Sequence, residues 1–196
     1  MLFNADKCKV MHIGYNNSHA DYFMNGNKLN TVSEEKDLGV VVSDDLKWEK
    51  QSSEAVKKAN RMLGVIKRSF TDRSKETIIP LYKSLVRPHL EYCSQIWSPH
   101  YKKDIKLIEG VQRRATKLVD GMRNLHYEGR LIQLNLMKLE NRRHRSDLLE
   151  TFKIANGYYN INSELFFMYD EGGRRGQSKK LYKRCSRLDV RKFTFS

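Results

Sequence analysis

The sequence predicts an α+β protein that is mostly α-helical, with a small antiparallel β region followed by a helical bundle. In residues 1–48, short apolar segments lie between turn residues, whereas from Trp48 onward apolar residues recur at helical spacing. The charge changes at the same place. Residues 1–48 carry 5 Lys and Arg against 7 Asp and Glu, residues 49–160 carry 23 against 12, and residues 161–196 carry 9 against 4. We therefore expect a β-rich domain over 1–48, a helical domain over 49–160, and a basic, loosely structured segment over 161–196.

The β region begins with residues 8–13, CKVMHI, in which apolar and polar residues alternate as in a strand. Asn25-Gly26 is a hairpin-turn signal between the segments DYFM and KLNTV, because both central positions of such a turn need positive φ. Leu38–Val42 is apolar and β-branched, and Gly39 suits a bulge or a close approach of backbones. Ser43, Asp44 and Asp45 then turn the chain. These segments predict a small set of antiparallel strands.

The helical region begins with a helix over roughly 47–69. Its apolar stripe consists of Ala55, Val56, Ala59, Met62, Leu63, Ile66 and Phe70. We expect Thr71 or Asp72 to cap a second helix, which Pro80 should kink or restart because proline removes one N–H from the ladder. On the continuation of that helix, Leu81, Leu85 and Val86 are expected to share one face.

Pro88 lies where a new helix could begin, and Pro99 ends that segment. The next helix has a stripe made of Ile105, Ile108, Val111, Gln112, Ala115, Leu118 and Val119. After Asp120-Gly121 interrupts the chain, we expect helices over about 127–135 and about 138–157. The second of these ends at Asn156-Gly157 and carries Leu139, Leu148, Leu149, Phe152 and Ile154. The remainder, including GGRRGQSKKLYKR, should be extended or loosely held.

The net charge of +14 is the first indication of function, since a basic domain of this size usually binds nucleic acid or an anionic membrane surface. No apolar run of about 18 residues occurs, so we expect no transmembrane helix. The three cysteines lie far apart and predict no disulfide framework, which favours a reducing compartment. Without a signal-peptide pattern at the start, the expected location is cytoplasmic or nuclear rather than secreted.

Basic residues occupy the faces opposite the apolar stripes of the first and third long helices. The candidate nucleic-acid-binding residues are Lys57, Lys58, Arg61, Lys67 and Arg68 on the first, with Lys106, Arg113, Arg114 and Lys117 on the third. The alternative is an ordinary solvated surface, but the excess of one sign favours binding. Four nearby aromatic residues could stack on bases, although most are more often core: Tyr82, Tyr92, Trp97 and Tyr101.

Two other patterns could indicate a metal site, but we do not expect one here. Asp44-Asp45 could bridge two metal ions in nucleotidyl transfer, but no third carboxylate is suitably placed and an acidic turn is ordinary. Zinc could use Cys8 with His12, or His89 with Cys93 and His100, but a structural site needs four ligands. We therefore predict no catalytic residue and no metal site in this chain.

Four segments, in order, resemble the C-terminal half of reverse transcriptases of non-LTR retrotransposons, above all Jockey and CR1-like elements: FNADKCKVMHIG, EEKDLGVVVSDDLKW, LYKSLVRPHLEYCSQIWSPHYKKDIKLIEGVQRRATKLV and LMKLENRRHRSDLLETFKIANG. The resemblance implies a hand-shaped RNA-directed DNA polymerase, with the end of the palm over 1–48 and the thumb over 49–160. It implies that Lys7 lies near the incoming triphosphate. It also implies that Leu38, Gly39 and Val40 form the tip of the primer-grip hairpin.

The family's catalytic aspartates belong to motifs upstream of FNADKCK, and neither motif occurs in this chain. We therefore expect a truncated copy or a partial gene model that is inactive alone and needs no cofactor, Mg²⁺ serving only the full-length enzyme. The expected partner is a template–primer duplex or an RNA–DNA hybrid, with no membrane partner, and the oligomeric state is open. The alternatives are an active enzyme, a non-catalytic basic nucleic-acid-binding or interaction module, and the poorly folding product of a pseudogene.

Overall fold

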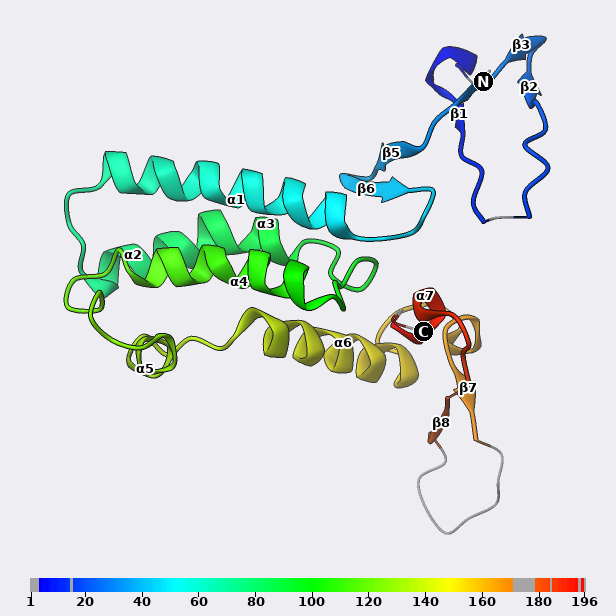
Figure 1. The fold of residues 1–196 in the computed structure, drawn as a ribbon. Coiled ribbons are helices and arrows are strands. Elements are labelled where there is room, and N and C mark those ends of the chain that lie inside the picture. The colour runs from blue at the N-terminus through cyan, green and yellow to red at the C-terminus, as the bar shows by residue number, and fades with distance from the viewer. Residues whose placement is uncertain (1–3, 15, 171–178, 184, 194, 196) are drawn as a thin grey trace.

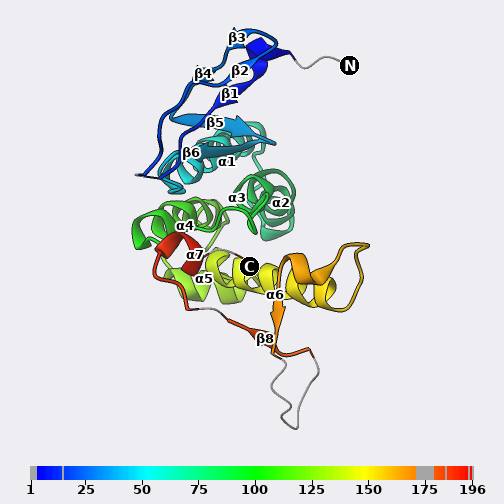
Figure 2. The same cartoon turned by 90° about the vertical axis from the view of Figure 1, so that its right-hand side faces the viewer.

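The computed structural model describes residues 4–14, 16–170, 179–183, 185–193 and 195 (Figure 1). It has an α+β architecture with small two-stranded sheets, in agreement with the predicted fold class. The views in Figures 1 and 2 show α1 and the β5–β6 hairpin in one layer, α2, α3 and α4 in the next, and α5 and α6 in a third. The segment GGRRGQS of the predicted loose tail lies outside the described residues.

The first strands are shorter than predicted, and one pair is parallel. After a 3₁₀ turn, η1 (Ala5–Lys7), strand β1 (Lys9–Val10) pairs in parallel with β4 (Asn30–Thr31). Between them, β2 (Phe23–Met24) and β3 (Asn27–Lys28) form the hairpin predicted at Asn25-Gly26, with φ of 51° and 79° at its centre. The expectation of antiparallel pairing throughout is therefore wrong at β1. The β2–β3 hairpin lies within the connection between β1 and β4, so β4 can lie beside β1 and run in the same direction.

A second hairpin joins β5 (Glu34–Asp37) to β6 (Val40–Ser43). Leu38 and Gly39 form its two-residue turn with φ of 44° and 87°, so the predicted strand over Leu38–Val42 is wrong at its first two residues. The polar segment EEKD forms the partner strand because β6 anchors it. Val40 of β6 is buried in the main core, and the Val41 N–H donates to Gln51 Oε1 of α1 at 2.9 Å.

The predicted first helix is α1 (Glu49–Ser69). Its apolar stripe is buried except for Met62, which is partly buried, and Phe70, which follows the helix and is exposed. The next helix, α2 (Lys75–Leu81), starts after Ser74 rather than after Thr71 or Asp72. The cap prediction is therefore wrong in position. Asp72 instead accepts a hydrogen bond from the Ser74 N–H at 2.9 Å, which shapes the turn before the helix.

Pro80 lies within the last turn of α2, which a π-helical turn, η2 (Tyr82–Val86), follows. The next helix is α3 (Arg87–Glu91), and Pro88 lies near its start. The wider turn changes which residues face inward, since each π turn contains an extra residue. Tyr82, Val86 and Leu90 are fully buried, whereas Leu85 is 40% exposed. The predicted shared face of Leu81, Leu85 and Val86 is therefore wrong.

The remaining predicted helices are present as α4 (Lys102–Thr116), α5 (Tyr127–Gln133) and α6 (Leu139–Ala155). Gly121 lies between two helices and Gly157 follows the end of one, and both have the positive φ expected there, 74° and 70°. Burial along α6 is uneven, and Ile154 near its C-terminal end is only 7% exposed. Leu139 is fully buried, but Leu148 and Phe152 are 71% and 56% exposed, so the predicted stripe on α6 is only partly a core face.

The C-terminal segment has more regular structure than predicted. It contains a 3₁₀ turn, η3 (Ser163–Leu165), an antiparallel pair of β7 (Met168–Tyr169) with β8 (Leu181–Tyr182), and α7 (Asp189–Lys192). Phe167 is buried, whereas the strand residues around it are mostly exposed. In the described part of the chain, no helix is both long and apolar enough to cross a membrane.

Candidate nucleic-acid interface

Helices α1 and α4 lie side by side and run in the same direction (Figure 1). Two hydrogen-bonded pairs establish their register: Lys103 Nζ to Glu49 Oε2 at 2.6 Å, and Arg114 Nη2 to Asn60 Oδ1 at 3.0 Å. In both pairs the partners are 54 residues apart, so the helices advance together over most of the length of α4. Their inner faces are buried in one core, and the Asn60–Arg114 contact joins the margins of their exposed faces.

The exposed face of α4 carries positive charge toward both ends of the helix. Both acidic residues of this helix, Asp104 and Glu109, are buried. The exposed charged residues are therefore all basic: Lys102, Lys103, Lys106, Arg113, Arg114 and, directly after the helix, Lys117. Such a face concentrates positive potential along about 22 Å, given a rise of 1.5 Å per residue.

The basic residues predicted on α1 contribute unequally. Lys57, Arg61, Lys67 and Arg68 are exposed, and Lys57 is paired with Glu54 at 2.7 Å. Lys58 is half-buried, and its position two residues from Asn60 places it on the side of α1 away from α4. The structure thus brings together eight of the nine predicted residues and separates Lys58 from them. We call the surface formed by Lys57, Arg61, Lys67, Arg68, Lys106, Arg113, Arg114 and Lys117 the α1–α4 basic surface.

Two arginines of this surface are held in place by neighbouring side chains. The Arg114 guanidinium donates to Asn60 Oδ1 through both Nε and Nη2, at 3.3 and 3.0 Å. The Arg113 guanidinium carbon lies 4.1 Å from the centre of the Tyr127 ring, within cation–π range. Asn60 and Tyr127 were not predicted as functional residues. Their roles depend on contacts between helices, and no local sequence pattern reports those contacts.

Tyr127 belongs to a buried polar network that joins α4, α5 and α6. Its hydroxyl donates to Glu109 Oε1 and accepts from Gln112 Nε2, the latter at 2.9 Å. Glu109 Oε2 also accepts from the Leu139 N–H at 3.0 Å, which satisfies a free donor at the start of α6. Tyr82 donates to Gln112 Oε1 at 2.8 Å. Burial first, and then the hydrogen bond to Glu109, raise the pKa of Tyr127 well above its ordinary value.

The residues assigned by the resemblance lie on the β side of the molecule. Lys7 is exposed at the end of η1. Leu38 is 80% exposed at the tip of the β5–β6 hairpin, whereas Val40 is buried beneath it. The Tyr92 hydroxyl donates to the Leu38 carbonyl oxygen at 2.9 Å and so ties the tip to the end of α3.

The acidic turn is held by hydrogen bonds to Asp45. Asp45 Oδ1 accepts from Ser43 Oγ at 2.8 Å and from the Lys47 N–H at 3.0 Å, as expected for a turn residue. The bond from the Lys47 backbone is the main cause of the lowered pKa of the Asp45 carboxyl. Among the described residues, no group of three His, Cys, Asp or Glu side chains could hold an ion.

The four aromatic residues considered for stacking divide into two pairs. Tyr82 and Trp97 are fully buried core residues, and the Trp97 Nε1–H donates to the Tyr92 carbonyl oxygen at 2.7 Å. Tyr92 and Tyr101 are 54% and 40% exposed.

Comparisons with models of protein families, with curated proteins and with solved structures found no match to this chain.

Proposed function

We propose that the chain binds a nucleic-acid duplex, either a template–primer duplex or an RNA–DNA hybrid, through the α1–α4 basic surface. The observation that carries the proposal is the exposed face of α4, on which all the charged residues are basic while its two acidic residues are buried. Phosphate groups are the ligands that such a surface suits, because each Lys or Arg that contacts a phosphate releases a condensed counterion.

The geometry suits recognition of a backbone rather than of base edges. The axes of packed helices lie about 8–10 Å apart, so α1 and α4 present two neighbouring rows of cations along a common direction. Arg113 and Arg114 are oriented by Tyr127 and Asn60 before any ligand binds. Less side-chain entropy is then lost on binding, which favours affinity without requiring a particular base sequence.

We further propose that this binding surface is the thumb of a non-LTR retrotransposon reverse transcriptase and that residues 1–48 are the end of its palm. The motifs quoted above support this proposal, together with the exposed Leu38 at the tip of the β5–β6 hairpin. In that role the chain supplies duplex binding and no catalysis. A primer-extension assay with Mg²⁺ or Mn²⁺ should detect no template-directed incorporation, and any incorporation by the purified chain would overturn the non-catalytic role.

The binding proposal is tested by measuring duplex affinity as a function of salt. Affinity should fall steeply with increasing salt for the unmodified chain. The double variant Arg113→Ala/Arg114→Ala should lower the slope of log affinity against log salt by about 2, one for each lost phosphate contact. Lys28→Ala/Lys36→Ala, which removes the same charge from the β region, should leave the slope nearly unchanged. Affinity that does not depend on salt, or equal slopes in the two double variants, would favour the solvated-surface alternative.

A further inference from the structure

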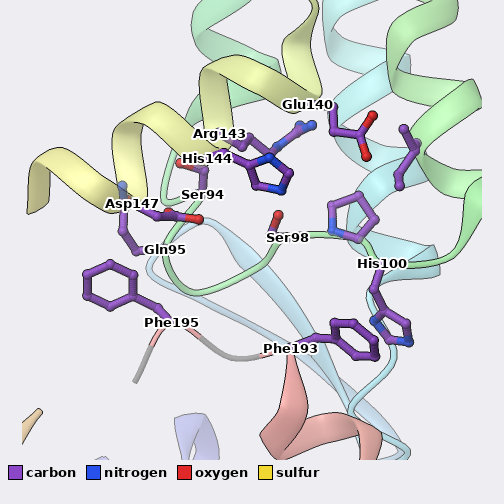
Figure 3. A pocket seen from close by; sticks show the side chains of 12 residues that line it. Ser94, Gln95, Ser98, His100, Glu140, Arg143, His144, Asp147, Phe193 and Phe195 are labelled. Carbon is purple, nitrogen blue, oxygen red and sulfur yellow. The ribbon is translucent and has the colours of Figure 1, made fainter. Parts of the chain in front are cut away.

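A cavity of about 270 Å³ lies between the loop that follows α3, one side of α6 and the C-terminal segment (Figure 3). Its polar wall comes from α6, which contributes Arg143, His144 and Asp147. The loop contributes His100, and the C-terminal segment contributes Phe193 and Phe195. The cavity is therefore bounded by hydrogen-bonding groups on one side and by aromatic rings on the other. Its volume is close to the lower end of the range for small-molecule sites.

Three buried polar atoms of the lining have no hydrogen-bond partner among the described residues: Arg143 Nε, His100 Nε2 and Asp147 Oδ1. Arg143 is only 4% exposed, and its guanidinium is held by donation from Nη2 to the Leu90 carbonyl oxygen at 2.7 Å and by Trp97, 5.4 Å away. Buried polar groups are rarely left unpaired in folded proteins. The lining therefore offers a fixed donor, a carboxylate acceptor and an imidazole nitrogen to a ligand.

The aromatic wall is flat. The rings of His100 and Phe193 are stacked, with centroids 4.4 Å apart and an angle of 4° between their planes. Phe193 is 46% exposed and so retains free ring surface. Phe195 contacts Phe167 edge-on, at 6.0 Å between centroids. Planar heterocycles pack well against such rings.

The charges around the cavity nearly balance, which argues against a free anion as the ligand. Asp147 and Glu140 line the same wall as Arg143 and His144. Burial raises the pKa of the Asp147 carboxyl, while the charges of His144 and Arg143 act in the opposite direction. A suitable ligand is planar and uncharged and carries both N–H donors and a carbonyl acceptor.

We propose that this cavity binds a nucleobase, guanine in preference to the others. Guanine presents two neighbouring N–H donors to the Asp147 carboxylate and a carbonyl oxygen to Arg143, and its ring can pack on the Phe193 and Phe195 side. The inference rests on the proposed nucleic-acid binding and extends it. Lys102 and Lys103 of the basic face of α4 lie at the same end of that helix as Ile105, which lines the cavity.

The test titrates the full chain with the four uncharged nucleosides at high salt and follows binding by calorimetry and NMR. Guanosine should bind most tightly. Asp147→Asn preserves the shape of the side chain but removes its charge, and Phe195→Ala removes ring surface. Each should weaken guanosine binding by roughly tenfold, in line with measured stacking and charged hydrogen-bond effects. Phe152→Ala removes an exposed ring from α6 outside the cavity and should change nothing.

Circular dichroism checks that each variant keeps its fold. If no nucleoside binds, or if Asp147→Asn and Phe195→Ala both bind guanosine as the unmodified chain does, the base site is refuted. Because nucleosides lack phosphate, that failure would leave salt-dependent duplex binding untouched. A duplex with one unpaired guanine identifies the source of the base. Tighter binding than to the fully paired duplex indicates a base within a strand, and equal binding indicates a free nucleoside or nucleotide.

Discussion

At the scale of single residues, buried polar groups determine how the binding surface is built. Glu109 would cost stability if it were buried alone, but it accepts from Tyr127, from Gln112 and from the first N–H of α6. The same Tyr127 ring supports the Arg113 guanidinium on the opposite, exposed side. One aromatic residue thus links the interior network to the proposed phosphate-binding surface.

Tyr127→Phe should lower the free energy of unfolding by about 1–3 kcal/mol at neutral pH, because it leaves the buried Glu109 and Gln112 short of a partner. The variant should also be less sensitive to alkali. The pKa of Tyr127 is raised in the folded state, so its contribution is present below the unfolded value of about 10 and is lost as the pH rises beyond it. Urea unfolding at pH values from 7 to about 11 measures both effects.

Tyr159→Phe is the matched control, since that hydroxyl bonds to Glu150 at 2.6 Å on the protein surface. It should have little effect at either pH. An alkaline loss of stability in Tyr127→Phe as large as in the unmodified chain would show that another group is responsible. Tyr82 is the first candidate, because burial also raises its pKa.

At the scale of elements, turns and helix faces account for most of the structure. The β5–β6 hairpin depends on two consecutive residues with positive φ, Leu38 and Gly39. Only glycine adopts this conformation without steric cost. The tip also accepts a hydrogen bond from the Tyr92 hydroxyl through the Leu38 carbonyl oxygen. The hairpin tip is therefore held both by its own backbone and by α3.

Gly39→Ala should lower the free energy of unfolding by about 1–2 kcal/mol, the usual cost of placing a Cβ in the left-handed region. A Cβ at this position would lie 3.4 Å from Tyr92, an ordinary contact, so the backbone conformation should cause most of the loss. Gly129→Ala is the control, because that glycine lies within α5 with open space around it. It should raise stability by about 0.5–1 kcal/mol. Thermal unfolding compares the two, and equal changes would contradict the assigned turn.

At the scale of the whole molecule, the core belongs almost entirely to the helices. Among residues 4–14 and 16–48, which the structure describes, only Val40 is buried in the main apolar cluster, with Trp48 packed against its edge. The rest of that cluster comes from α1, α2, η2, α3, α4, the start of α6 and the segments next to these helices. The strands of residues 9–31 have little buried apolar surface of their own.

Hydrogen exchange of the intact chain should therefore be slowest in α1, η2 and α4 and much faster in β1 to β4, because local opening costs least where few apolar contacts are lost. Residues 40–43 of β6 should be intermediate, since they contact α1. Exchange measured by mass spectrometry or NMR would test this order. Protection of β1–β4 equal to that of α1 would mean that the β region is stabilised by contacts outside the described core.

The helices were predictable because their apolar residues recur at helical spacing and their ends carry local signals. Gly121 and Gly157 interrupt the chain where expected, and Asn25-Gly26 forms its hairpin. The errors arose where packing replaced a local rule. Leu85 is exposed because a π turn follows Pro80, and Leu148 is exposed because no other element in the described part of the chain packs on that part of α6. The strand β5 formed from EEKD because the apolar β6 provides its partner.

The amino-acid order alone determined that the helices are amphipathic and that their outer faces are basic, since side-chain direction follows from the 3.6-residue turn. Tertiary structure decided which cations share a surface. The constant offset of 54 residues between α1 and α4 places Arg114 beside Asn60, and the packing of α5 places Tyr127 beneath Arg113. Tertiary structure also brought together three segments that are distant in the sequence to form the cavity lined by Arg143 and Asp147. Such contacts depend on how helices pack against one another, and helical spacing within one segment contains no information about its neighbour.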